Sequence, residues 1–464
     1  MRSFLLRILI LIILLGLIFI PAVLSVNADL RRADANFAAG NDAAAAVDYE
    51  HAARFYFWRG DLWERAGLAA YAGQDLPNAI RLLETAPSLS VQGWTDLGNA
   101  YLQTGKVDQA IHAFQRGVKA RGGAASLYYG LTLAYNAQGD LAAETSALGN
   151  YLAFKKDDAA AHYRYGLLLT LSDLHRAVDE LSSAAQLDAA FDPAYQTMRS
   201  AINLAALQTD ASKRFVIVGR GLGLVQEWPL AREVFQRAVN ADAKNAEAWA
   251  WLGEANQHLG QDGRGELERA ESLDPFNANV RALFGLYWKR AGDAKRALAE
   301  FQWAAILEPQ NPNWQAALGE AYAQAGNLPP ALEAYQRAAD LAPTDPSFWR
   351  LLAVFCAQYS YQTAEVGVPA AHQVATLLPN DAASFDLLGW LYLTSGLTSE
   401  AEVTLTRTLS MDPNLASAHL HLAMVYLQLG QWNSAREHLL LARGLDANGE
   451  TGKSAAQLLA QYFP

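Results

Sequence analysis

A pattern of large and small residues recurs along this chain at a spacing of 34 residues. One copy reads WTDLGNAYLQTGKVDQAIHAFQRG and starts at Trp94. Its residues Trp94, Leu97, Gly98 and Tyr101 fall on one face of a helix. Gly105 interrupts that helix, and Ala110, Phe114 and Gly117 form the inner face of a second helix. The pattern therefore predicts a series of helical hairpins, in which small residues let the paired helices approach closely.

Two later copies keep the same template. Their template residues are Phe284, Gly285, Trp288, Gly292, Ala297, Phe301, Ala304 and Pro309 in one copy, and Leu318, Gly319, Tyr322, Gly326, Ala331, Tyr335, Ala338 and Pro343 in the other. This order of residue types resembles the tetratricopeptide repeat (TPR) family. The resemblance implies an all-α fold, a right-handed superhelical solenoid of helix-turn-helix hairpins with an inner groove.

The register of the template divides the chain into segments. Residues 27–192 are expected to form an amino-terminal block of repeats, and residues 212–449 a carboxy-terminal block. Between them, residues 193–211 fit one extra helix, which should kink the array. Residues 450–464 are expected to form a capping helix. Repeats are expected to start near Val26, Gly60, Val91, Ala125, Ala159, Ser212, Ala246, Ala278, Pro312, Pro346, Ala382 and Ala416.

Two features of the copies bear on the core. The first copy carries Asp29 and Arg32 where the template has apolar residues. One template position is repeatedly tryptophan, and we expect those side chains in the core: Trp63, Trp94, Trp249 and Trp349. The expected capping helix offers Leu458, Leu459 and Tyr462 to cover the last open repeat.

The amino terminus carries nineteen residues without a charge, from Ile8 to Val26. That length is close to the roughly 20 residues that a helix needs to cross a bilayer. Residues 1–26 are therefore expected to be a transmembrane anchor or a signal peptide, with membrane contact through residues 4–26. Arg2 and Arg7 precede the uncharged stretch. If the anchor is retained, they would keep the amino terminus in the cytoplasm and place the repeats on the extracytoplasmic face of the cell membrane. Cleavage at small residues near its end would give a secreted protein.

The stretch ANGETGKS, from Ala447 to Ser454, satisfies a relaxed form of the phosphate-binding loop motif. Such a loop joins a strand to a helix, so that backbone N–H groups and the helix dipole face the phosphates. Here the preceding residues fit the second helix of a repeat, and only ten residues follow. We interpret the stretch as a turn in which Asn448 and Gly449 end that helix and Thr451 or Ser454 caps the next. No nucleotide is expected.

Other chemical signals are weak. The net charge of −11 disfavours nucleic acid as a partner. The glycine-rich stretch Gly219–Gly223 falls within a repeat and follows no strand, and the single cysteine, Cys356, is expected in the core. His419 and His421 are two residues apart and would face different directions on a helix, so they cannot share a metal. We expect no catalytic residues, cofactor or metal.

The resemblance also implies which residues line the inner groove, since relatives use the fifth and ninth positions of each repeat. Carried over to this chain, the candidate partner-binding residues are Asn99, Tyr129, Leu133, Tyr163, Leu167, Arg220, Leu286, Trp390 and Met424. Only Asn99 matches the residue types with which some relatives grip a peptide carboxylate, so an apolar partner segment is expected. The alternative, that an error of register has selected core positions, stays open.

These expectations together favour a non-catalytic protein–protein interaction scaffold that is tethered to a membrane. Its partner would be another protein, membrane-bound or extracytoplasmic. The alternative is a recruiting or regulatory subunit of an envelope enzyme, or of a complex for polysaccharide assembly or secretion. Neighbouring genes for glycosyltransferases or exporters would favour this alternative.

Overall fold

The structure is a computed structural model that describes the backbone of residues 2–464 and the side chains of residues 20–464. Over residues 2–464 the chain forms helices and no strand. It divides into two compact units. Unit 1 comprises Met1–Leu207 and Leu224–Leu230, and unit 2 comprises Gln208–Gly223 and Ala231–Pro464.

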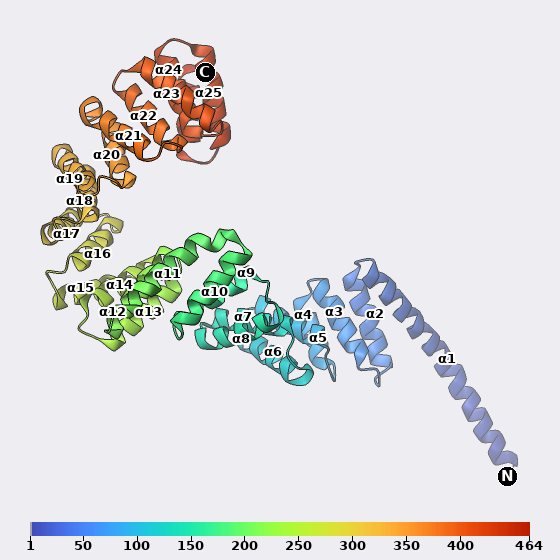
Figure 1. The fold of residues 1–464 in the computed structure, drawn as a ribbon. Helices are drawn as coiled ribbons and strands as arrows, with labels where there is room; N and C mark the ends of the chain where they lie inside the picture. The colour runs from blue at the N-terminus through green and yellow to red at the C-terminus, as the bar shows by residue number, and fades with distance from the viewer. Residues whose placement is uncertain (1) are drawn as a thin grey trace. The chain divides into compact units, whose positions relative to one another are not determined.

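Unit 1 is a series of helical hairpins followed by a single helix, α11 (Figure 1). Its helices are α1 (Arg2–Ala38), α2 (Asp42–Phe55), α3 (Asp61–Ala72), α4 (Leu76–Thr85), α5 (Val91–Gln103), α6 (Val107–Arg121), α7 (Ala125–Gln138), α8 (Leu141–Phe154), α9 (Ala159–Leu169), α10 (Leu174–Leu187) and α11 (Asp192–Ala206), with a 3₁₀ turn at Ala189–Phe191.

Unit 2 contains most of the remaining hairpins and a closing helix. Its helices are α12 (Ala211–Leu224), α13 (Trp228–Ala241), α14 (Ala246–His258), α15 (Arg264–Leu273), α16 (Ala278–Arg290), α17 (Ala294–Leu307), α18 (Pro312–Gln324), α19 (Leu328–Leu341), α20 (Pro346–Gln358), α21 (Val368–Leu377), α22 (Ala382–Thr394), α23 (Thr398–Met411), α24 (Ala416–Gln428), α25 (Trp432–Leu445) and α26 (Glu450–Tyr462), with a π-helical turn at Thr363–Gly367. The last residue of α12 and the first residues of α13, within Leu224–Leu230, belong to unit 1.

Most helices that open a hairpin begin where the sequence pattern places a repeat start. Those that begin at the expected residue are α5, α7, α9, α14, α16, α18, α20, α22 and α24. Helices α3 and α12 begin one residue away from the expected Gly60 and Ser212. The all-α, right-handed superhelical solenoid of hairpins is confirmed.

Within the hairpins, a glycine of the first helix contacts a large side chain of the second helix, sixteen residues further along. The pairs are Gly67 and Leu83, Gly98 and Phe114, Gly219 and Phe235, Gly285 and Phe301, Gly319 and Tyr335, and Gly389 and Leu405. A Cβ atom on Gly98 would lie 2.3 Å from Phe114 Cε1, well inside van der Waals contact. We call these pairs the glycine contacts. They show why Gly219, in the glycine-rich stretch, belongs to hairpin packing.

In several first helices, the side chain of the fourth residue donates a hydrogen bond to the loop that precedes the helix. Trp249 Nε1 donates to the carbonyl oxygen of Ala243 at 3.0 Å, and Trp349 Nε1 donates to that of Pro343 at 3.0 Å. Each donor reaches back six residues, so the indole is anchored to the inter-repeat turn. Trp94 is buried, whereas Trp63, Trp249 and Trp349 are half-buried against the core. The expectation of a tryptophan core is therefore met fully only at Trp94.

Ion pairs replace apolar packing in the first repeat. Arg32 Nη2 lies 2.8 Å from Asp29 Oδ1, and the same guanidinium bonds Asp48 of α2. The second carboxylate oxygen of Asp29 lies 2.8 Å from His51 Nδ1. Asp29 and Asp48 are both buried, so each needs the partners it has. The two charged residues that depart from the template thus join α1 to α2.

The turn before α26 differs from the sequence-based interpretation. Helix α26 begins at Glu450 with no side-chain cap from Thr451 or Ser454. Instead the carboxylate of Asp446 accepts a hydrogen bond from the backbone N–H of Thr451 at 3.1 Å. Lys453 Nζ lies 2.8 Å from Glu450 Oε1 on the surface of α26. The motif follows helix α25, so its lysine faces a carboxylate of its own helix.

Helix α26 covers the last repeat through fewer residues than expected. Leu459 is buried against Leu439 and Ala442 of α25, and Leu458 packs partly on the same cluster. Tyr462, expected to take part, is 42% exposed. The helix therefore closes the core chiefly through Leu459 and the fully buried Ala455.

The segment predicted as an anchor or signal peptide falls mostly outside the described side chains, which start at residue 20. In the portion that is described, we find no helix with the length and apolar character needed to span a membrane. Cys356 is fully buried in the core of α20, as expected, and burial raises the pKa of its thiol to about 12.

Two imidazoles meet in the last repeat. His419 Nδ1 of α24 lies 2.8 Å from His438 Nδ1 of α25, and His419 Nε2 lies 3.0 Å from the carbonyl oxygen of Pro413. Burial, together with the adjacent His419, lowers the pKa of His438. His421 turns to a different helix, as the spacing predicts, and bonds Asp386.

The glycine contacts generate a stability prediction. Gly98→Ala places a methyl group against the Phe114 ring, and we expect the free energy of unfolding to fall by about 1–3 kcal/mol. The matched control is Gly444→Ala in α25, where a Cβ would meet no atom within 4 Å. That helical substitution should stabilise the protein by about 1 kcal/mol or less. Urea unfolding followed by circular dichroism measures both, and equal effects would contradict the packing account.

The histidine pair predicts a pH dependence of stability. In the unfolded chain His438 protonates near its ordinary pKa of 6.5, whereas the folded protein resists protonation. Its contribution to stability is therefore complete above that pH and is lost as the pH falls toward the lower folded-state pKa. His438→Gln should flatten the urea midpoint between about pH 7 and pH 5. The exposed His175, changed to Gln, is the control, and an unchanged slope in His438→Gln would refute the assignment.

Candidate functional site

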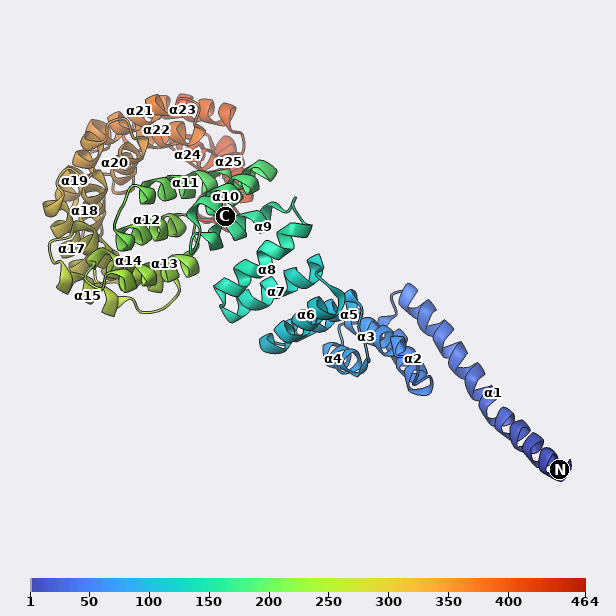
Figure 2. The same cartoon turned by 60° about the horizontal axis from the view of Figure 1, so that its bottom comes forward.

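The first helices of the hairpins line the inner side of the arc formed within unit 2. Figure 2 shows α14, α18, α20, α22 and α24 on that side, with α15, α17, α19, α21 and α23 outside them. We call the surface formed by first helices the inner face. The predicted residues divide between the units. Asn99, Tyr129, Leu133, Tyr163 and Leu167 lie in unit 1, and Arg220, Leu286, Trp390 and Met424 lie in unit 2.

In unit 1 the predicted residues differ in accessibility. Tyr129 and Leu133 of α7 are 46% and 43% exposed and can therefore be reached from solvent. Asn99 and Tyr163 are half-buried. Leu167 is fully buried, because α8 and α10 both pack against α9 and leave its carboxyl end no open surface. For Leu167 the prediction is wrong, and it is a core residue.

Aromatic neighbours hold the two tyrosines in place. The Tyr129 ring lies 5.2 Å from that of Tyr151, and the Tyr163 ring stacks on Phe191 at 4.8 Å between centroids. Burial, with the carboxylate of Glu227 nearby, raises the pKa of Tyr163. Its hydroxyl therefore stays protonated near neutral pH and can donate a hydrogen bond.

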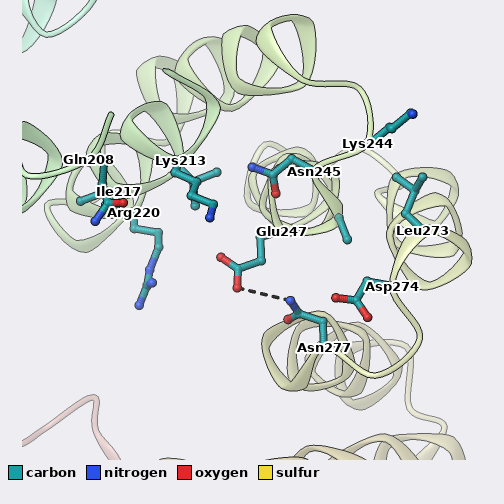
Figure 3. Close-up of a pocket in the computed structure, with 12 residues that line it drawn as sticks. Gln208, Lys213, Ile217, Arg220, Lys244, Asn245, Glu247, Leu273, Asp274 and Asn277 are labelled. Atoms are coloured by element: carbon teal, nitrogen blue, oxygen red, sulfur yellow. Dashed lines mark hydrogen bonds between the residues drawn. The ribbon is translucent and has the colours of Figure 1, made fainter. Parts of the chain in front are cut away.

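In unit 2 a cavity of about 560 Å³ opens between α12, α14 and the turn before α16. Figure 3 shows Lys213 and Arg220 projecting from α12 on one side of it and Glu247 of α14 on the other. Lys244 also borders the cavity but points away from the other labelled side chains. Val216, Ile217 and Leu273 supply its apolar wall. This cavity is the candidate site.

Local structure positions the polar groups of the cavity. Asn277 Oδ1 accepts from the N–H of Val280 and caps α16, while its Nδ2 lies 3.5 Å from Glu247 Oε1. Asn279 Nδ2 donates to the same Glu247 oxygen at 2.8 Å. The side-chain amides of Asn277 and Asn279 thus hold the Glu247 carboxylate in place on its side of the cavity.

The cations of the cavity are less engaged. The Arg220 guanidinium lies 5.2 Å from the centre of the Trp251 ring, which holds it by a cation–π contact. Within residues 20–464, neither Lys213 nor Arg220 forms an ion pair with a carboxylate. Both are exposed and seven residues apart on α12, so their positive ends lie on the same side of the helix. The arrangement is suited to bind a carboxylate at the cations and a peptide N–H at Glu247.

Sequence reasoning identified Arg220 but missed Lys213 and Glu247. Both are second residues of their repeats, counted from Ser212 and Ala246. Only the fifth and ninth positions were considered, although the second position lies one turn before the fifth on the same face. Including that position would have found the two charges.

The remaining predicted residues of unit 2 are partly core. Leu286 and Met424 are half-buried and pack against hydrophobic clusters. The Trp390 indole stacks on the His421 imidazole at 5.2 Å between centroids, with planes 7° apart. His421 Nδ1 lies 2.8 Å from Asp386 Oδ1, which orients the ring. Trp390 therefore presents a fixed but only half-accessible aromatic surface.

Comparison with known proteins identifies the repeats. One tetratricopeptide repeat profile matches residues 290–354 and 392–462, and a second matches residues 95–153. No curated protein matches the sequence.

Several solved structures are similar in fold. The Cut9–Hcn1 hetero-tetramer of APC/C is 17% identical over 93% of this chain and 95% of that chain, with a TM-score of 0.44. Yeast Tom70 is 14% identical over 94% of this chain and 95% of that chain, with a TM-score of 0.38. A tetratricopeptide repeat protein from Parabacteroides merdae is 14% identical over 54% of this chain and 99% of that chain, with a TM-score of 0.40. Residues 95–153, 290–354 and 392–462 therefore match tetratricopeptide repeats, whose fold supports a protein–protein interaction scaffold.

Proposed function

We propose that the protein is a non-catalytic scaffold, tethered to a membrane through residues 4–26, that binds a segment of a partner protein on its inner face. The uncharged sequence from Ile8 to Val26 supports the tether. The arginines before it favour an extracytoplasmic position for the repeats.

The observation that carries the binding proposal is the cavity of unit 2. It combines two cations without carboxylate partners, a fixed acceptor at Glu247 and an apolar wall to which the end of α15 contributes Leu273. An extended segment with one acidic side chain would place its carboxylate at Lys213 and Arg220 and its backbone along Glu247. In a chain with a net charge of −11, Lys213 and Arg220 are cations of the cavity that would attract an acidic side chain of the partner.

Site-specific crosslinking in native membranes tests the proposal. A benzophenone amino acid in place of Ile217 or Tyr129 reports contacts on the inner face. The same group in place of Val403, which is 72% exposed on the outer helix α23, is the matched control. We expect a defined crosslinked protein from the inner positions and none from Val403, because the partner lies along the first helices.

Charge reversal then tests the role of the cations. Lys213→Glu should greatly reduce the yield of the crosslink from Ile217, which lines the same cavity. Arg214→Glu changes the charge of an adjacent exposed residue that does not line the cavity, and should leave the yield unchanged. Equal crosslinking from Val403 would place the partner on the outer face and overturn the proposal.

A further inference from the structure

The loop between α2 and α3 exposes an unusual amount of aromatic surface. It follows Phe55 with Tyr56, Phe57 and Trp58, and Phe57 and Trp58 are 79% and 64% exposed. The Trp58 ring packs edge-on against Tyr56 at 5.4 Å and against Phe57 at 5.0 Å. These contacts hold the rings together without removing them from solvent. We call residues 55–58 the aromatic loop.

The aromatic loop lies beside the point at which α1 joins the repeats. Tyr56 Oη donates to Asn27 Oδ1 of α1 at 3.2 Å, and Phe55 and Tyr56 pack against the buried cluster that contains Val26. Helix α2 runs back along the second half of α1, so its carboxyl end returns to the middle of that helix (Figure 1). Val26 is also the last residue of the uncharged stretch.

Helix α1 exposes apolar side chains a few residues before Val26. Ile20 and Leu24 are 60% and 64% exposed, whereas Val26 is 3% exposed in the core of the first hairpin. Three residues of helix separate Leu24 from Asn27, a rise of about 4.5 Å. The aromatic loop contacts α1 at Asn27. The exposed aliphatic side chains of α1 therefore lie about one helical turn or two before the point at which the loop meets the helix.

We propose that the aromatic loop contacts the interfacial layer of the lipid bilayer that α1 enters. The inference rests on the membrane tether proposed above and adds a second point of contact. Tryptophan and tyrosine favour the headgroup region, where an apolar ring and a polar N–H or O–H are both accommodated. Contact at α1 and at the loop fixes the first hairpin against the membrane surface, which a single helix would leave free to rotate.

Spin labelling of the full-length protein in phosphatidylcholine–phosphatidylglycerol liposomes tests this contact. A nitroxide is attached at Phe57→Cys, and the control is Phe276→Cys, which replaces a 68% exposed phenylalanine in the inter-repeat turn before α16. The native Cys356 is fully buried, so the parent protein serves as the unlabelled blank. Collisions with oxygen, which concentrates in lipid, are compared with collisions with a water-soluble nickel complex.

We expect the label at position 57 to collide more with oxygen than with nickel, and the label at position 276 to show the reverse ratio. If the protein fails to float with the liposomes, the tether and the loop contact are both wrong. If it floats and both labels favour nickel, the loop contact alone is wrong. A label at position 57 that is shielded from both reagents would assign the loop to a protein partner instead and would also overturn the inference.

Discussion

The close approach of two helices at a glycine is the constraint on which the hairpins with a glycine contact depend. In the pair Gly98 and Phe114, the ring occupies the space that a Cβ would take, and the same ring also lies 2.3 Å from the Cβ position of Gly130 in the next hairpin. One side chain thus sets the separation within a repeat and between repeats. Where the contact recurs at a sixteen-residue spacing, the hairpins present their first helices in the same way.

The candidate site follows from this regular placement. Turns before the first helices bring capping residues such as Asn277 to one edge of the inner face, next to side chains of the second position such as Glu247. Helix α12 contributes Lys213 and Arg220 from one side of its surface. The site therefore needs no residue that departs from the repeat geometry, only a choice of charged side chains at positions that the repeat already exposes.

The fold was largely predictable, because its signals are local in sequence. Glycine, a large apolar residue sixteen positions later and the turn between them mark several repeats, and nine first helices begin at the expected residue. What the sequence left open depends on partners distant in the chain. The pairing of Asp29 and Arg32 with α2 follows from the packing of α1 on α2, and the burial of Leu167 follows from the packing of its neighbours.

The site was predicted only in part for a related reason. Arg220 was identified from its position, but its relation to Lys213 and Glu247 arises from three consecutive repeats packed side by side. The sequence allows aromatic residues such as Trp390 to lie either in the core or on the surface. In the structure Trp390 is half-buried, with its ring stacked on His421. Residue type and register alone did not separate these roles.

Hydrogen exchange of the membrane-bound protein, with and without the partner crosslinked through the inner face, tests the central claim most directly. Binding on the inner face predicts slower exchange in α12, α14 and the turn before α16, with α13 and α15 unchanged. Protection confined to α13 and α15, or no change in unit 2, would contradict the assignment of the binding surface.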